Sequence, residues 1–258
     1  MTDVASDTGL IDHLTAASLC RTIMLPELRL LLAAVPPDAQ PAAYREAIIA
    51  QNVLLKPTLD SRKDTYRYLR DRYGLDPRLP LFRALRDLWD ADPAAQSLLA
   101  MLLASARDPV LRATADTVLP LAPGEPVTAP MLANAIASAF PGRFREATLA
   151  VMGRLVAASW TQSGHLAGRA PKRRVRVTCR PVAVAFALLV GHLGDARGDG
   201  LFATPWVRLL DAPPHLLREQ AMDAARLGWI EYRHAGYVTD IGFHVLLREG
   251  EHRNGADA

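Results

Sequence analysis

The chain has 258 residues, of which 50% are apolar and 22% charged, so we exclude an intrinsically disordered protein and expect one to three folded domains. Its two cysteines, Cys20 and Cys179, are far apart, which excludes a zinc-ligand spacing or a disulfide framework and favours a reducing cytoplasm. The first residues, MTDVASDTGLID, are too acidic and polar for a signal peptide, and the longest apolar run, residues 182–190, is too short to cross a bilayer. We therefore expect a cytoplasmic protein without a membrane partner.

Residues 1–92 are predicted to form an N-terminal helical domain of the helix-turn-helix type. Its proline and glycine residues separate expected helices at residues 14–21, 26–34 and 41–54. The run LDSRKDTYRYLRDRYGL then predicts a longer helix, which Asp60 or Ser61 can cap and Gly74 closes.

This longer helix has two interpretations. Its cations are Arg62, Lys63, Arg67 and Arg70, and they fit a recognition helix that contacts DNA. Alternatively, the helix is simply amphipathic: its tyrosines pack inward, and its arginines pair with Asp64 and Asp71. The sequence leaves both interpretations open.

Residues 93–180 are predicted to form a middle domain. It begins with an apolar helix, AAQSLLAMLLASARD, and a second helix follows Pro109. The proline-rich residues 119–126 are interpreted as a loop inside this domain, because the preceding helices need partners for their apolar faces. Thr128 is then expected to cap a further helix with Pro130 in its first turn.

The stretch from residue 144 to 180 predicts a helix followed by a β-hairpin. Apolar side chains recur at helical spacing up to Trp160, which we expect to be a core residue rather than a base-stacking one. Gly168 and Pro171 predict the hairpin turn. In the second strand, Val175, Val177 and Cys179 are expected to point inward, and Arg174, Arg176 and Thr178 outward. A helix followed by a cationic hairpin is typical of a winged helix-turn-helix.

Charge is concentrated in this stretch. Residues 143–180 hold nine Lys or Arg residues and one acid, a local net charge of +8 in a chain of net +3, so the other residues carry −5. Such a cluster indicates a surface that binds polyanions, although it would also suit a solvated basic hairpin. The expected contacts to DNA are Arg143, Arg145, Arg169, Lys172, Arg173, Arg174 and Arg176. Few aromatic residues accompany these cations, which favours duplex backbone contacts over a stacking platform.

The runs NVLLKPTLDSRKDTYRYLRDRYGL and SWTQSGHLAG, the latter preceding a basic hairpin, resemble the BrxA family of the BREX phage-defence operons. The resemblance extends from about Met24 to about Phe243. It implies a largely helical protein, likened to the antitermination factor NusB, that binds double-stranded DNA. Because that family has no catalytic motif, the resemblance implies no active-site residues.

Residues 181–248 are predicted to form a C-terminal domain with a second winged-helix pattern. After an apolar helix from Pro181 comes a further helix, HLLREQAMDAARLGW. Residues 230–233 and 237–240 are then expected to pair across the turn at residues 234–236. The charge here is mixed, so we expect a structural or protein-contacting role, and we expect a disordered tail at residues 249–258.

No pattern in the sequence predicts catalysis. The seven histidines are scattered, and the nearest approach to a cluster is His192 with Asp195 and Asp199, at a helix end followed by a loop. Cys179 is expected to be a buried filler rather than a nucleophile. We therefore expect no enzyme, no cofactor and no metal.

Taken together, the sequence predicts a mainly α protein with tandem winged-helix-like or helix-turn-helix domains and short β-hairpin wings. The predicted function is a non-catalytic, double-stranded DNA-binding component of a BREX-type anti-phage system. Two alternatives stay open: a protein-interaction scaffold for other defence-system proteins, and an RNA-binding factor of the antitermination type.

Overall fold

The structure is a computed structural model that describes residues 8–236 and 238–248. This part of the chain is mainly helical with small antiparallel sheets, which confirms the predicted mainly α class. The expected disordered tail, residues 249–258, lies outside the described residues, as does Tyr237 in the last predicted strand.

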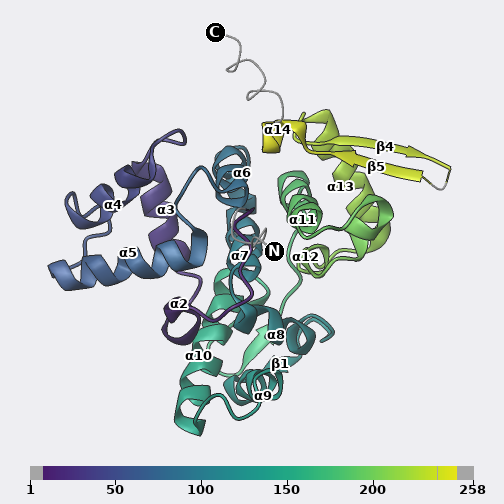
Figure 1. Cartoon of the computed structure of the whole chain (residues 1–258). Helices are drawn as coiled ribbons and strands as arrows, with labels where there is room; N and C mark the ends of the chain where they lie inside the picture. Colours follow the sequence, from purple (N-terminus) through teal and green to yellow (C-terminus); the bar gives the residue numbers. More distant parts are fainter. Residues whose placement is uncertain (1–7, 237, 249–258) are drawn as a thin grey trace.

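The N-terminal helices lie on the left of Figure 1, joined to the centre through α6. They are α2 (Ala16–Cys20), α3 (Leu25–Ala34), α4 (Pro41–Ile49), α5 (Leu59–Tyr73) and α6 (Pro80–Trp89). Thr58 and Ser61 bond each other's backbone N–H groups and so form a capping box at the start of α5. The predicted cap at Asp60 or Ser61 was therefore wrong, whereas Gly74 ends the helix as expected, with a φ of 89°.

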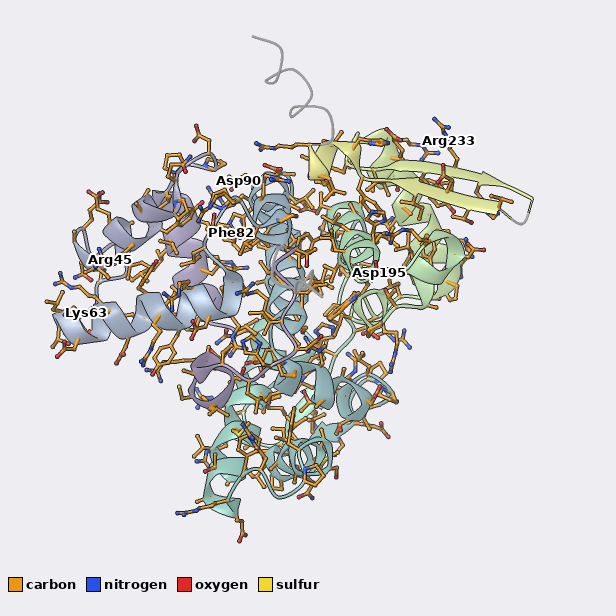
Figure 2. All side chains as sticks on the ribbon, in the orientation of Figure 1. Arg45, Lys63, Phe82, Asp90, Asp195 and Arg233 are labelled. Carbon is orange, nitrogen blue, oxygen red and sulfur yellow. The ribbon has the colours of Figure 1, made fainter. Side chains whose placement is uncertain are left out.

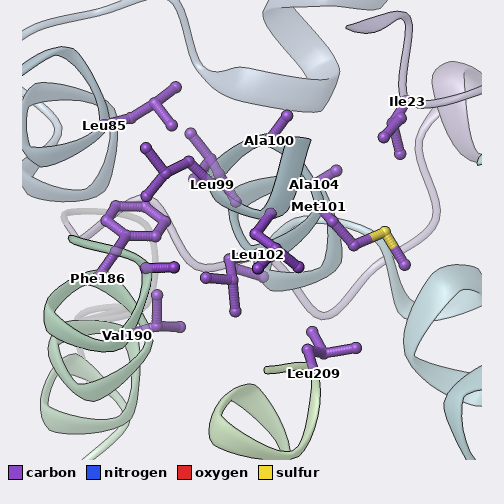
Figure 3. Close-up of a cluster of buried hydrophobic side chains, with 14 of the residues drawn as sticks. Ile23, Leu85, Leu99, Ala100, Met101, Leu102, Ala104, Phe186, Val190 and Leu209 are labelled. Atoms are coloured by element: carbon purple, nitrogen blue, oxygen red, sulfur yellow. The ribbon is translucent and has the colours of Figure 1, made fainter. Parts of the chain in front are cut away.

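Two helices that are apolar on every side form the centre of the molecule. They are α7 (Gln96–Ala106), which follows the short 3-10 helix η1 (Pro93–Ala95), and α11 (Pro181–Leu193). Residues 98–106 of α7 and 182–191 of α11 are all buried, as expected for core helices. In Figure 3, Leu99 and Leu102 of α7 face Phe186 and Val190 of α11, while Met101 points toward the opposite side.

The middle part of the chain lies at the bottom of Figure 1 and combines helices with a small sheet. Its elements are α8 (Pro109–Val118), β1 (Pro126–Val127), α9 (Ala129–Ala139), α10 (Glu146–Gln162), β2 (Leu166–Ala167) and β3 (Lys172–Arg174). The three strands are antiparallel in the order β1-β3-β2, with Pro126 opposite Arg173 and Leu166 opposite Arg174. The proline-rich residues 119–126 thus lead directly into this sheet.

The C-terminal part contains a hairpin that projects at the upper right of Figure 1 and is followed by the short helix α14. Its elements after α11 are η2 (Gly198–Ala203), α12 (Pro205–Arg208), α13 (Pro214–Arg226), β4 (Glu231–Ala235), β5 (Val238–Gly242) and α14 (His244–Leu247). The pairing runs from Glu231 opposite Gly242 to Ala235 opposite Val238. The hairpin is longer than predicted, because His234 and Ala235, expected in the turn, continue the strand.

Buried and half-buried ion pairs join the parts of the chain that the sequence suggested as domains. Arg72 of α5 pairs with Asp108, whose other carboxylate oxygen caps the start of α8. Arg180, immediately before α11, pairs with Asp92 at 3.0 Å. Buried apolar residues of all three predicted segments also belong to one core cluster. The three predicted segments therefore share a single core. The domain boundaries predicted at 92/93 and 180/181 stay predictions.

Within residues 8–236 and 238–248, no helix has the length and apolar character needed to span a membrane.

Candidate nucleic-acid interface

The candidate interface is built on α9 and α10, which pack closely on each other. Thr128 caps α9 by accepting a hydrogen bond from the Met131 N–H at 3.4 Å, and Pro130 lies in the first turn, as predicted. Gly153 of α10 permits the contact, because a Cβ there would lie only 2.4 Å from the Ala129 carbonyl oxygen. The connection between the two helices turns at Gly142, whose φ is 68°.

α10 has a buried and an exposed face. Met152, Val156 and Trp160 are buried, and the Trp160 Nε1–H donates to Thr114 Oγ1 at 3.0 Å, which confirms Trp160 as a core residue. The opposite face exposes Ala147, Ala150, Val151 and Arg154. The outward face therefore combines small or apolar residues with one long cation and, at the start of the helix, the exposed acid Glu146.

Arg154 was not among the predicted contacts. It is exposed and lines both surface cavities that follow α10. The helical spacing of the apolar stripe through Met152 and Val156 already places position 154 on the opposite face, so this signal was present in the sequence.

The hairpin presents its predicted cations unequally. Arg169 is exposed in the loop between β2 and β3, and half-buried Lys172 begins β3. Arg173 is exposed, although its guanidinium donates to the Gly124 carbonyl oxygen at 2.8 Å. Arg169 and Lys172 remain without an ion pair or side-chain hydrogen bond to any described residue.

The prediction that Arg174 faces outward was wrong. Its side chain is 1% exposed and its guanidinium pairs with Asp211 at 2.7 Å, while Nε donates to the Val118 carbonyl oxygen. Val175, expected to be inside, is 38% exposed, because β3 ends at Arg174 and the chain then leaves the sheet. The strict alternation from 174 to 179 therefore does not hold.

Arg176 lies apart from the hairpin loop. With Thr178 and Arg180 it lines a cavity of about 260 Å³ beside Ser97 and Ser163. Ser163 immediately follows α10, so Arg176 is near the C-terminal end of that helix. The predicted contacts Arg143 and Arg145 are exposed near the other end, about 25 Å away along the helix axis at 1.5 Å per residue.

Two adjoining cavities connect the start of α10 with the hairpin. Their volumes are about 690 Å³ and 330 Å³, and Ala129, Pro130 and Arg154 line both. The smaller reaches Glu146 and the larger reaches Arg169 and Lys172. Arg154, Arg169 and Lys172 thus lie along one groove; Glu146 is the acid that lines it.

The predicted contacts on α5 are mostly engaged within the protein. Arg62 donates to the carbonyl oxygens of Ile49 and Lys56 at 3.3 and 3.4 Å. Arg67 pairs with Asp64 at 2.9 Å and Arg70 with Asp71 at 3.5 Å.

Aromatic packing on α5 also engages these side chains within the protein. Tyr68 and Tyr73 are buried, and the guanidinium of Arg67 lies 4.9 Å from the centre of the Tyr68 ring. A hydrogen bond to the Tyr68 hydroxyl raises the pKa of Arg67. This geometry matches the amphipathic-helix interpretation. Figure 2 places exposed Lys63 at the outer end of α5, away from α9 and α10.

Two of the residues considered for chemistry, Cys179 and Asp199, have surroundings that the structure describes in detail. Burial raises the pKa of the Cys179 thiol to about 11, so it is protonated at neutral pH. Asp199 pairs with Arg218 at 3.0 Å and accepts a hydrogen bond from Thr239 at 2.6 Å. Among the described residues, no group of three or more His, Cys, Asp or Glu side chains could hold a metal ion.

Neither a scan against models of protein families nor a search of curated proteins gives a significant match to this chain.

Proposed function

We propose that residues 109–174 form a winged helix-turn-helix that binds double-stranded DNA without catalysing a reaction. The order α8–β1–α9–α10–β2–β3, with β3 pairing to both other strands, supports this assignment. In this arrangement α9 and α10 are the helix-turn-helix, α10 is the recognition helix, and the loop at residues 168–171 is the wing.

The observation that carries the proposal is the alignment of cations without partners along one groove. Arg154, Arg169 and Lys172 make no ion pair with any described residue, and Arg145 lies at the end of α10 that the groove approaches. Lys and Arg that lack protein partners can neutralise DNA phosphates and release their counterions. The resulting affinity for DNA is sensitive to salt and only weakly selective for sequence.

The C-terminal part repeats the pattern of helices followed by a hairpin, with α11, α12, α13 and β4–β5. Here two of the cations are engaged: Arg218 pairs with Asp199 at 3.0 Å, and Arg226 with Asp223 at 2.7 Å. We assign to this second winged-helix-like unit a structural or protein-contacting role. The resemblance to the BrxA family gives the cellular context of the proposal, a BREX-type anti-phage complex with other defence proteins.

The test is a duplex titration with a charge-reversed groove. The variant Arg154→Glu, Arg169→Glu, Lys172→Glu should lose duplex binding in fluorescence anisotropy, because it places three anions where phosphates would lie. Its matched control is Arg78→Glu, Arg226→Glu, Arg233→Glu, which changes net charge equally at exposed cations outside residues 109–174. Figure 2 places Arg233 on the projecting hairpin. The control should bind duplex much as the natural protein does.

Single replacements measure the individual contacts. Each of Arg154→Ala, Arg169→Ala and Lys172→Ala should flatten the slope of log affinity against log salt by about one. Equal loss of binding in the groove variant and in its control would contradict the proposed interface. Preferential binding of structured RNA in direct competition would favour the antitermination alternative. Partner capture that survives nuclease treatment, without duplex binding, would favour the scaffold.

A further inference from the structure

The larger cavity of the groove has an apolar interior between β1, α9, α10 and the wing loop. Val127 of β1, Ala129 and Pro130 of α9, and Ala157 of α10 form one side, and Ala170 and Pro171 of the wing loop form another. Its volume of about 690 Å³ falls in the range of small-molecule sites, and its lining is mostly apolar. Water over such a surface is displaced favourably by an apolar group.

The cavity exists because its lining side chains are short. Ala129, Ala157 and Ala170 occupy positions where larger apolar residues would fill the space. The close contact of α9 with α10 at Gly153 adds rigidity to one wall, since the Ala129 carbonyl lies where a side chain would otherwise stand. One wall of the cavity is therefore held in place by the close backbone contact between α9 and α10.

The charged residues of the cavity all have one sign. Arg154, Arg169 and Lys172 line it, and its lining within residues 8–236 and 238–248 contains no Asp or Glu. Among the described residues, none makes an ion pair with these three side chains. An apolar interior beside cations that lack partners complements a ligand with an apolar body and one anionic head.

We propose that this cavity binds a small amphipathic anion, namely an alkyl or aryl carboxylate. The apolar body lies against Pro130, Ala157 and Pro171, and the carboxylate accepts hydrogen bonds from Arg154, Arg169 or Lys172. Occupancy neutralises cations that the groove would offer to phosphates, so the ligand and duplex compete. This competition rests on the proposed function; the binding of the ligand does not.

The test compares three probes that share one chain and differ in the head group: decanoate, decanol and decyltrimethylammonium. The two ionic probes are used below their micelle concentrations and decanol below its solubility limit. In isothermal titration calorimetry, decanoate should bind the full-length protein about tenfold or more tightly than the other two, because only its head pairs with the cations. The variant Arg154→Gln, Arg169→Gln, Lys172→Gln should lose that preference while decanol binding is unchanged. The control Arg78→Gln, Arg226→Gln, Arg233→Gln should keep it.

A second variant tests the apolar part of the site. Ala170→Trp places a large ring into the cavity from the exposed wing loop, so the fold should be retained and all three probes should fail to bind. Equal affinities for decanoate and decanol, or undiminished decanoate affinity in the Gln variant, would overturn the inference. Decanoate binding without any duplex binding would remove the proposed function and leave this inference standing.

Discussion

Arg174 and Asp211 lie 2.7 Å apart, with side chains 1% and 10% exposed. Removing one member of such a pair leaves a buried charge without compensation, whereas replacing both is often close to neutral. We predict that Arg174→Met lowers the free energy of unfolding by about 3–5 kcal/mol. Urea denaturation checks this value, and the double variant Arg174→Met, Asp211→Leu should recover much of the loss. A cost below about 1 kcal/mol for the single variant would show that the pair is dispensable.

His165 is buried against the same ion pair. Its Nε2–H donates to the Leu209 carbonyl oxygen at 2.9 Å, and Nδ1 lies 2.8 Å from the Ser163 hydroxyl, which itself donates to the Trp160 carbonyl oxygen at 2.9 Å. The contact at Nε2 suits a neutral ring. Desolvation by burial lowers the pKa of His165 to about 4; nearby Arg174 acts in the same direction, and the Leu209 carbonyl and Asp211 oppose it.

This pKa predicts a loss of stability in mild acid. The unfolded chain protonates near the ordinary pKa of 6.5 and the folded ring only near 4, so between these values the unfolded state holds more protons. The free energy of unfolding should fall by roughly 2 kcal/mol from neutral pH to about pH 5 through this residue. Denaturant titrations at both pH values measure the fall, which should shrink by that amount in His165→Gln. An identical fall in the variant would assign it to other groups.

The burial of a single residue could be predicted from the sequence where its local pattern favoured one environment strongly. Trp160 continues an apolar helical stripe, and its burial follows from that stripe alone. Arg174 could not be placed in this way, because its burial depends on Asp211 and the Val118 carbonyl, which lie far from it in the sequence. An arginine at a strand end has the same local pattern whether it faces solvent or a distant carboxylate.

The pairing of α9 with α10 depends on the absence of a side chain at one position. In Gly153→Ala, the new Cβ would lie 2.4 Å from the Ala129 carbonyl oxygen and 3.1 Å from the Ala133 Cβ, so the helices must separate. We predict a loss of about 1–3 kcal/mol of unfolding free energy despite the higher helix propensity of alanine. Thermal denaturation measures this loss.

A matched control for that replacement is Gly200→Ala, because no heavy atom lies within 4 Å of a Cβ built there. This variant should unfold close to the natural protein. If Gly153→Ala were as stable as the control, the two helices would have enough freedom to adjust, and their close contact would not fix this wall of the groove.

Helix positions were easier to predict than strand pairing. Pro41, Gly74, Pro109 and Thr128 mark the ends of helices through backbone chemistry that acts locally, and the structure places each of them at or beside a helix end. The sheet is different because its strands have two or three residues, which is too short for a period of two to be read. In particular, no sequence pattern predicts β1 as a strand. It is a strand only through its pairing with β3.

At the scale of the whole molecule, the central helices join segments that are distant in the sequence. α11 packs on α6, α7, α12 and α13, and α14 returns to contact α6. The sequence indicates that α7 and α11 are core helices, since both are apolar all round, but their pairing is not encoded in any local pattern. A continuous core and buried ion pairs between segments make independent unfolding of one segment unfavourable.

We therefore predict one cooperative unfolding transition. The four tryptophans sample the chain: Trp89 lies in the first predicted segment, Trp160 in the second, and Trp206 and Trp229 in the third. Tryptophan fluorescence of variants that retain only Trp89 or only Trp160 should give the same denaturation midpoint as far-UV circular dichroism. Midpoints that differ between these probes would indicate segments that unfold separately.

The ion pair between Arg174 and Asp211 also affects how a fragment of this chain would bind DNA. A fragment that stops after Arg180 would keep every residue of the proposed wing and yet lose the carboxylate that holds the base of β3. Its freed guanidinium would add a cation to the fragment surface that the intact chain keeps inside. Tight duplex binding by such a piece would therefore overstate the affinity of the whole protein.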